Sequence, residues 1–243
     1  MIPAGPGAFA LVAAGAAVLL GSVVQGAVGF GLALVAAPIL FLIDPRLVPG
    51  PMIFASMVLT VLVAIRDRHD VDVPGIGWGL VGRLPGTLLG AAMLALLTPE
   101  QLAGPFGALV LLGVVLSASG LRVALNPRTF MAAGLLSGFM GTASSIGGPP
   151  IAMLYQHAPG SRLRGTLSAY FTIGGVMSLA AIAFVGRFGA SELFWGACLA
   201  PGAAIGFAIS SPLSRRLDAG FTRHAVLSVA AMAGLSVIVR QLL

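Results

Sequence analysis

The stretch LLGSVVQGAVGFGLALVAAPIL at residues 19–40, together with GLLSGFMGTASSIGGPPIAMLY at residues 134–155, decides how this sequence folds. Each stretch lies inside a long apolar run, at about residues 7–43 and 129–156. Glycine and proline interrupt helices, and an interrupted backbone inside a membrane is tolerated only where protein or a wet cavity surrounds it. We therefore expect each run to form a helical hairpin that enters and leaves the membrane on the same side.

The composition of the whole chain excludes a soluble domain. Of the 243 residues, 58% are hydrophobic and only 8% are charged, with a mean hydropathy of +1.05. Soluble domains have about a quarter of their residues charged. With about 20 apolar residues per span, the sequence predicts an all-α integral membrane protein with no room for a soluble catalytic domain. The remaining apolar runs lie at about residues 48–65, 75–97, 101–121, 165–186, 190–213 and 224–242.

An internal repeat organises these eight runs. At an offset of 112 residues, Pro38 is matched by Pro150, and Gly26 and Gly29 are matched by glycines. At an offset of 116, Pro85-Gly86 is matched by Pro201-Gly202. We predict two repeats, residues 1–121 and 122–243, each with four apolar segments that begin with the broken hairpin. Duplicated halves of this kind are typical of transporters.

The arginines predict the topology, because basic loops stay in the cytoplasm. If both first segments are hairpins, three arginines lie on one side and nine on the other. A hairpin that returns to its own side plus three further segments gives each half an odd number of membrane crossings. The second half therefore begins on the opposite side from the first, so the two repeats are predicted to be inverted, with both termini periplasmic. Hairpin arms of about 16 residues could each cross a thin or tilted path. The nine are Arg66, Arg68, Arg122, Arg128, Arg162, Arg164, Arg215, Arg216 and Arg223, and the three are Arg46, Arg187 and Arg240.

The two interruptions are the candidate substrate site. A half-helix that starts after a break points its free N–H groups and the positive end of its dipole into the cavity, which suits an anion. Polar side chains lie in the breaks, and prolines close them. The side chains are Gln25, Thr142, Ser144 and Ser145, and the prolines are Pro38, Pro149 and Pro150. The alternative is that the small residues serve only close helix packing.

Arg83 is the one charged residue well inside an apolar run. A buried arginine in a membrane is costly and faces a cavity or a partner. The position that corresponds to it in the second half is Leu199. Arg83 is therefore a candidate ligand for an anion, and the alternative is that its side chain reaches toward an interface.

No enzyme, metal or nucleotide motif is present. The patterns HExxH, GxSxG, GxxxxGK[ST] and CxxC do not occur, and Cys198 is the only cysteine. These patterns supply metal ligands, nucleophiles and phosphate cradles. We expect a protein that is not an enzyme and has no metal and no cofactor.

At the two breaks the sequence resembles the TauE/SafE sulfite exporter family, also called the TSUP family. The resemblance covers essentially the whole chain in length, segment count and the position of both motifs. It implies a bacterial inner-membrane transporter of a small anion, such as sulfite or an organosulfonate like sulfoacetate. By the resemblance, the first motif contains Gln25, Gly26, Gly29, Gly31 and Pro38, and the second contains Gly138, Gly141, Gly147, Gly148, Pro149 and Pro150.

Three functions remain open from the sequence. The first is a secondary transporter in which the two inverted halves rock around a midplane anion site, driven by the membrane potential or by a coupled proton. The second is a membrane scaffold or assembly protein without transport, and the third is an anion channel that uses the same site. The expected partners are a small anion and the lipid bilayer, with no nucleic acid. A homo-oligomer is compatible with the sequence.

Overall fold

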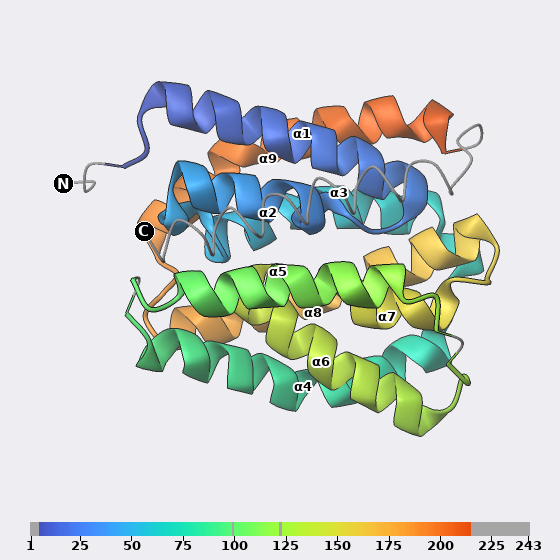
Figure 1. The fold of residues 1–243 in the computed structure, drawn as a ribbon. Coiled ribbons are helices and arrows are strands. Elements are labelled where there is room, and N and C mark those ends of the chain that lie inside the picture. The colour runs from blue at the N-terminus through green and yellow to red at the C-terminus, as the bar shows by residue number, and fades with distance from the viewer. Residues whose placement is uncertain (1–4, 99, 122, 215–243) are drawn as a thin grey trace.

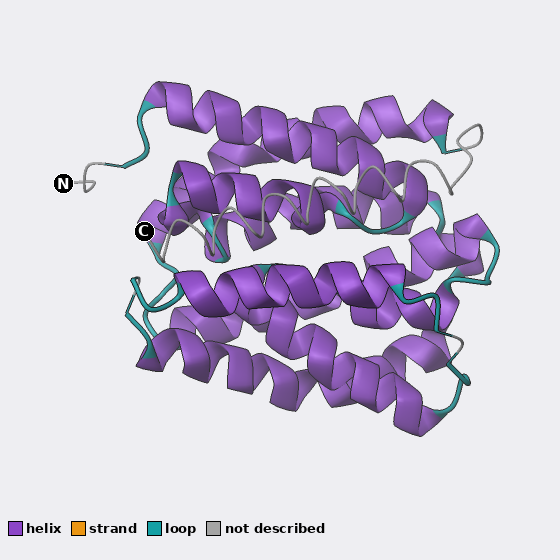
Figure 2. Cartoon of the chain, in the orientation of Figure 1, coloured by secondary structure: helices purple, strands orange, loops and turns teal. Residues whose placement is uncertain are grey.

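The computed structural model describes residues 5–98, 100–121 and 123–214. This part of the chain is helical and contains no strand, as Figure 2 shows, which confirms the all-α prediction. Two 3-10 turns, Pro45–Leu47 and Arg68–Asp70, connect longer helices. The α-helices are α1 (Ala8–Val28), α2 (Leu32–Ile43), α3 (Gly50–Arg66), α4 (Val73–Leu96), α5 (Ala103–Ala118), α6 (Pro127–Ser144), α7 (Gly148–Tyr155), α8 (Gly160–Phe184) and α9 (Ala190–Leu213).

Within the described residues, four helices are long and apolar enough to cross a membrane: α1, α4, α8 and α9. The shorter apolar helices α2, α3 and α5 lie among them. The protein is therefore a multi-pass membrane protein. Seven of the eight apolar runs fall on these elements, and the two runs with the glycine-rich motifs each form a pair of helices. The run at 224–242 lies outside the described residues.

The first break is three residues wide and reads Gly29-Phe30-Gly31. α1 ends at Gly29, whose φ of 110° is in the left-handed region, and α2 begins after Gly31, whose φ is 122°. A side chain in this conformation is strained, so glycine is the residue that makes the reversal possible here. The amide of Gly29 donates to the carbonyl of Gln25 and closes the last turn of α1. The two helices then run antiparallel (Figure 1).

The second break contains one left-handed residue where the first contains two, and that residue is not glycine. α6 ends at Ser145, with φ of 67°, and α7 begins after Gly147. Left-handed non-glycine residues are uncommon and cost about 1 kcal/mol. The Oγ of Ser145 donates to the carbonyl of Pro49 on the neighbouring loop at 3.1 Å, and this bond helps to hold the turn.

The breaks are narrower than the sequence indicates. The prediction placed them at residues 25–31 and 138–150, but α1 continues to Val28 and α6 continues to Ser144. The predicted equal arms of about 16 residues are therefore wrong: they measure 21 and 12 residues in the first pair and 18 and 8 in the second. Glycine-rich sequence remains helical where a neighbouring helix packs against it. The two caps, Gly29 and Ser145, follow the 116-residue offset and not the 112-residue one.

Close glycine contacts join the two halves of the chain. α4 packs along α6, and α1 packs along α9. A Cβ added at Gly134 or Gly138 of α6 would overlap the backbone of α4, and one at Gly202 of α9 would lie 2.6 Å from the carbonyl oxygen of Gly15 on α1. Small residues allow backbones in a membrane to approach in this way. Consequently the contacts between residues 1–121 and residues 122–243 are more extensive than those between two separate domains.

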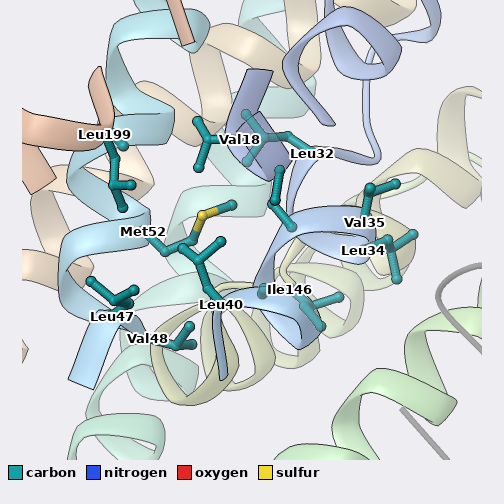
Figure 3. Packing of buried hydrophobic residues seen from close by; sticks show 14 of the residues in the cluster. Val18, Leu32, Leu34, Val35, Leu40, Leu47, Val48, Met52, Ile146 and Leu199 are labelled. Carbon is teal, nitrogen blue, oxygen red and sulfur yellow. The ribbon is translucent and has the colours of Figure 1, made fainter. Parts of the chain in front are cut away.

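The core is divided between two bundles. One apolar cluster joins α1, α2, α3 and α9 with α5 and the last turns of α6, and includes Leu32, Leu40, Met52 and Ile146 (Figure 3). A second cluster joins α4, α6, α7 and α8 around the fully buried Leu167. Figure 1 shows α1 and α9 on one side of the molecule and α4 and α6 on the other. A third, smaller cluster of Ile53, Leu94 and Ile182 joins α3 to α4 and α8 across the seam between the two bundles.

The two ends of the molecule differ in charge. We call them the α7–α8 end and the α8–α9 end after the connections that lie there (right and left in Figure 1). In the described residues the α7–α8 end holds Arg66, Arg68, Arg128, Arg162 and Arg164, and the α8–α9 end holds Arg46 and Arg187. α1 begins at the α8–α9 end and α6 begins at the opposite end (Figure 1), which is the arrangement that an inverted repeat needs. The inversion stays a prediction, and Arg122, Arg215, Arg216, Arg223 and Arg240 lie outside the described residues.

Candidate functional site

A small cavity lies where the two breaks meet. Its volume is about 60 Å³, room for about four waters at 10–15 Å³ each. Gly31 and Leu32 of the first break line it, as do Ser145 and Gly147 of the second, and Arg83 of α4 completes it. The other lining residues are Gln25, Ala33, Leu34, Ile53, Ser56, Thr60, Gly141, Ile146, Gly148, Pro149, Phe171 and Gly175.

Arg83 lies near the middle of α4 and is only 4% exposed. Its Nη1 donates to the Oγ of Ser137 at 3.2 Å, and its Nη2 donates to the Oγ of Ser178 at 3.2 Å. The guanidinium also lies 5.1 Å from the ring centre of Tyr170, within the range of a cation–π contact. The alternative of a side chain that reaches toward an interface is therefore wrong, because serines of α6 and α8 hold the guanidinium inside the protein.

The charge of Arg83 is not balanced by a carboxylate in the described part of the chain. The ion pairs found there join Arg46 to Asp44, Arg66 and Arg164 to Asp67, and Arg162 to Asp72. The Nε of Arg83 is buried and has no hydrogen-bond partner there. An isolated buried charge is expensive unless it is paired. A guanidinium with unused donors at a cavity is thus suited to receive an anion.

The first break supplies neutral donors to the same cavity. The Oε1 of Gln25 accepts from the amide of Leu32 at 3.2 Å. This bond fixes the side-chain amide, and its NH2 group has two donors of its own. In the described residues no backbone acceptor is found for the amides of Ala33 and Leu34, which line the cavity in the first turn of α2. A helix N-terminus with free N–H groups favours negative charge.

Hydroxyl groups of α3 and of the second break complete the lining. Ser56 and Thr60 are one helical turn apart on α3, and Ser145 caps α6. Sequence reasoning missed Ser56 and Thr60. The signal was present: they are the polar residues of an otherwise apolar segment, ASMVLT, and residues four apart share one face of a helix. It also missed Ser137 and Ser178, which hold Arg83 from helices far away in the sequence.

The structure brings eight of the predicted site residues to the cavity and leaves six outside it. Those at the cavity are Gln25, Gly31, Arg83, Gly141, Ser145, Gly147, Gly148 and Pro149. Outside it, Gly26 faces Ser210, Gly29 faces Leu163, Gly138 faces the backbone of α4, Pro38 is buried inside α2, and Ser144 donates to the carbonyl of Met140. Thr142 does not line the cavity but contacts a residue that holds Arg83, because its Oγ1 lies 2.9 Å from the Oγ of Ser178.

Two larger hollows lie on either side of the cavity. One, of about 310 Å³, is at the α7–α8 end and is lined by Phe30, Pro149 and Gln156. It shares Pro149 with the cavity. The other, of about 200 Å³, is at the α8–α9 end and includes Arg46 and Pro49, and Pro49 accepts the hydrogen bond from Ser145. The cavity therefore has a hollow toward each end of the molecule.

A comparison with protein-family models matches residues 13–237 to the family described as "Sulfite exporter TauE/SafE". The chain belongs to the TauE/SafE family. The match covers nearly all of the chain and confirms the resemblance carried by the two glycine-rich motifs. The TauE/SafE family is a transporter family, which is consistent with a small anionic substrate and a bilayer location. Searches of curated proteins and of solved structures gave no match.

Proposed function

We propose that this chain is a secondary transporter that carries a small anion, sulfite or an organosulfonate, across the bacterial inner membrane. The observation that supports this most is Arg83, which is buried, has no carboxylate partner in the described residues, and lines a cavity between two helix breaks. Preorganised donors in a site without bulk water replace the hydration shell of an anion. Broken helices that meet at a central cavity are typical of transporters.

The anion would be held from three directions. Arg83 supplies the positive charge and the donors that its serine contacts leave unused. Gln25 and the amides of the first turn of α2 supply neutral donors from the first break. Gly147 and Gly148 allow the second break to approach closely, since an added Cβ at Gly147 would lie 2.8 Å from the carbonyl oxygen of Ser137.

Alternating access would come from the two bundles moving along their seam. The contacts of α1 with α9 and of α4 with α6 make it costly to rock residues 1–121 against 122–243. The proposed moving units are instead α1, α2, α3 and α9 against α4, α6, α7 and α8, with α3 sliding along α8, where these two units have their main contact. Opening at the α7–α8 end would separate Asp67 from Arg164, which lie 3.0 Å apart and tie α3 to α8. The arginine-rich end would face the cytoplasm and the N-terminus the periplasm.

The test is transport by purified full-length protein in liposomes loaded with sulfite. Arg83→Gln keeps polar groups near Ser137 and Ser178 but removes the charge. We expect it to lower the rate of sulfite efflux at least tenfold and to lower anion affinity by about 10- to 100-fold, because a charged hydrogen bond contributes about 1.5–3 kcal/mol. Arg83→Lys should have an efflux rate and an affinity between those of the wild type and Arg83→Gln, since lysine keeps the charge but lacks the forked donors of the guanidinium.

Arg128→Gln is the matched control, because this arginine is exposed at the start of α6, and it should transport normally. Thermal unfolding of each variant separates loss of function from loss of fold. If Arg83→Gln exported sulfite at the wild-type rate, the proposed anion site at Arg83 would be contradicted. No flux with any small anion would favour the scaffold alternative, and flux without saturation or exchange would favour the channel.

A further inference from the structure

The hydroxyl groups at the cavity have already committed their protons. Ser56 donates its Oγ proton to the carbonyl of Ile53 at 2.8 Å, and Thr60 donates to the carbonyl of Met57 at 3.2 Å. Ser145 donates to the carbonyl of Pro49 at 3.1 Å. A hydroxyl has one proton and two lone pairs. The Oγ1 of Thr60 also accepts from the Oγ1 of Thr172 at 3.0 Å, which leaves it one free lone pair. In this arrangement the three oxygens can only accept a hydrogen bond from a ligand, and a fully deprotonated anion has none to donate.

The charge at the cavity matches a single negative charge. Among the described residues Arg83 is the one cation in the lining, and no Asp, Glu or His lines it. The free amides at the start of α2 add neutral donors to the cavity but no further formal charge. A doubly charged ion would leave an uncompensated charge in a buried site, where such a charge is costly.

The volume sets a further limit. A cavity of about 60 Å³ admits a group of roughly four or five heavy atoms when about four waters fill it. The larger, doubly charged sulfoacetate exceeds this limit, whereas sulfite, sulfate and methanesulfonate fit within it.

We propose that the site selects the singly charged, proton-bearing form of a small oxyanion, such as hydrogensulfite. This inference rests on the proposed function and concerns the form in which the substrate occupies the same site. Arg83 and Gln25 donate to the anionic oxygens on one side. On the other side the oxygens of Ser56, Thr60 and Ser145 are the available acceptors, and one of them receives the single proton of the substrate. Anion and proton then cross together, and the proton coupling resides in the substrate itself.

The experiment is titration calorimetry of the full-length protein with sulfite at a series of pH values that span its second ionisation, near neutrality. We expect the affinity for total sulfite to fall about tenfold per pH unit above that ionisation, because only the protonated form binds. Methanesulfonate carries one charge at every pH and has three oxygens on sulfur like hydrogensulfite, but it carries a methyl group and no proton that it can donate. It should bind more weakly than hydrogensulfite and independently of pH, while sulfate and sulfoacetate should bind at least tenfold more weakly still.

A variant pair tests the acceptors directly. Ser56→Ala with Thr60→Val removes two of the three oxygens. It should weaken binding of hydrogensulfite about tenfold and leave methanesulfonate within about twofold, since a hydrogen bond contributes about 0.5–1.5 kcal/mol. Ser119→Ala is the matched control, because Ser119 also donates to a helix carbonyl but lies exposed at the end of α5.

Two outcomes separate the inference from the proposed function. If affinity rises with pH, or if sulfate or sulfoacetate binds at least as tightly as sulfite, and Arg83→Gln still abolishes binding, the inference is overturned and the transport site stands. An equal loss of hydrogensulfite and methanesulfonate in the variant pair also overturns it. If no anion binds in an Arg83-dependent way, the proposed function fails as well.

Discussion

The two helix breaks occupy corresponding places in the chain but differ in what they offer to the cavity. After the first break, α2 is 12 residues long, and the amides of Ala33 and Leu34 in its first turn are potential donors, while that of Leu32 donates to Gln25. After the second, α7 is only 8 residues long, and Pro149 and Pro150 occupy its first turn. Proline has no N–H group. The first break therefore supplies backbone donors, and the second supplies few.

The second break is instead connected to the charge. Ser137 accepts from Arg83 and donates to the carbonyl of Gly147 at 2.6 Å, so that one hydroxyl links the guanidinium to the break. At the position that corresponds to Arg83 in the second half, Leu199 is fully buried in the apolar core. The comparison teaches that two similarly placed helix breaks can contribute unequally to one site. The first break offers free backbone amides to the cavity. The second break is tied to the guanidinium of Arg83 through Ser137.

Among the variants that test the two breaks, Gly174→Ala is expected to have the largest effect on anion affinity, because it moves Arg83. A Cβ at this position of α8 would overlap the Nε and Cζ of Arg83, and the flexible guanidinium would shift while the helix remains. We expect anion affinity to fall about 30-fold, equivalent to about 2 kcal/mol, with thermal stability within a few degrees of the wild type. Gly77→Ala on α4 is the control, since nothing lies within 4 Å of its added Cβ. Unchanged affinity in Gly174→Ala would show that the position of Arg83 does not matter.

A smaller effect is expected from Gln25→Glu at the first break. The carboxylate keeps an oxygen that accepts from the amide of Leu32, so the start of α2 should persist. It replaces the NH2 donor at the cavity with a negative charge, which repels an anion. We expect affinity to fall about tenfold at neutral pH and to recover as the pH is lowered and the new carboxyl is protonated. Affinity that stays low at acid pH would indicate a structural defect, which thermal unfolding would detect.

The smallest effect is expected from Pro149→Ala at the second break. This change adds an N–H group in the first turn of α7, next to the cavity, and makes the two breaks more alike. Anion affinity should rise about threefold, since one neutral hydrogen bond contributes about 0.5–1.5 kcal/mol, while stability falls by about 0.4–1 kcal/mol because proline restricts the unfolded chain. Calorimetry and thermal unfolding measure the two changes separately. A fall in affinity would mean that the rigidity of the prolines, and not the missing donor, shapes the site.

Sequence reasoning found the elements but misplaced the breaks within them. Gly26 and Gly138 belong to the glycine-rich motifs, yet both are helical and face neighbouring side chains or backbone. Glycine has the same appearance in a sequence whether it allows a turn or a close helix contact. Ser145 forms the second turn without being glycine, and no sequence pattern distinguishes it from Ser144 beside it.

The sequence by itself determined the membrane-spanning helices, the two motifs and the unusual position of Arg83. These features are local: hydrophobicity over a span and a charge within it are visible in consecutive residues. Only the tertiary structure decided that Arg83 meets Ser137, Ser178 and both breaks at one cavity, and that Thr60 joins them. Those residues come from α3, α4, α6 and α8, and contacts between distant helices depend on how their small residues pack, which no single segment records.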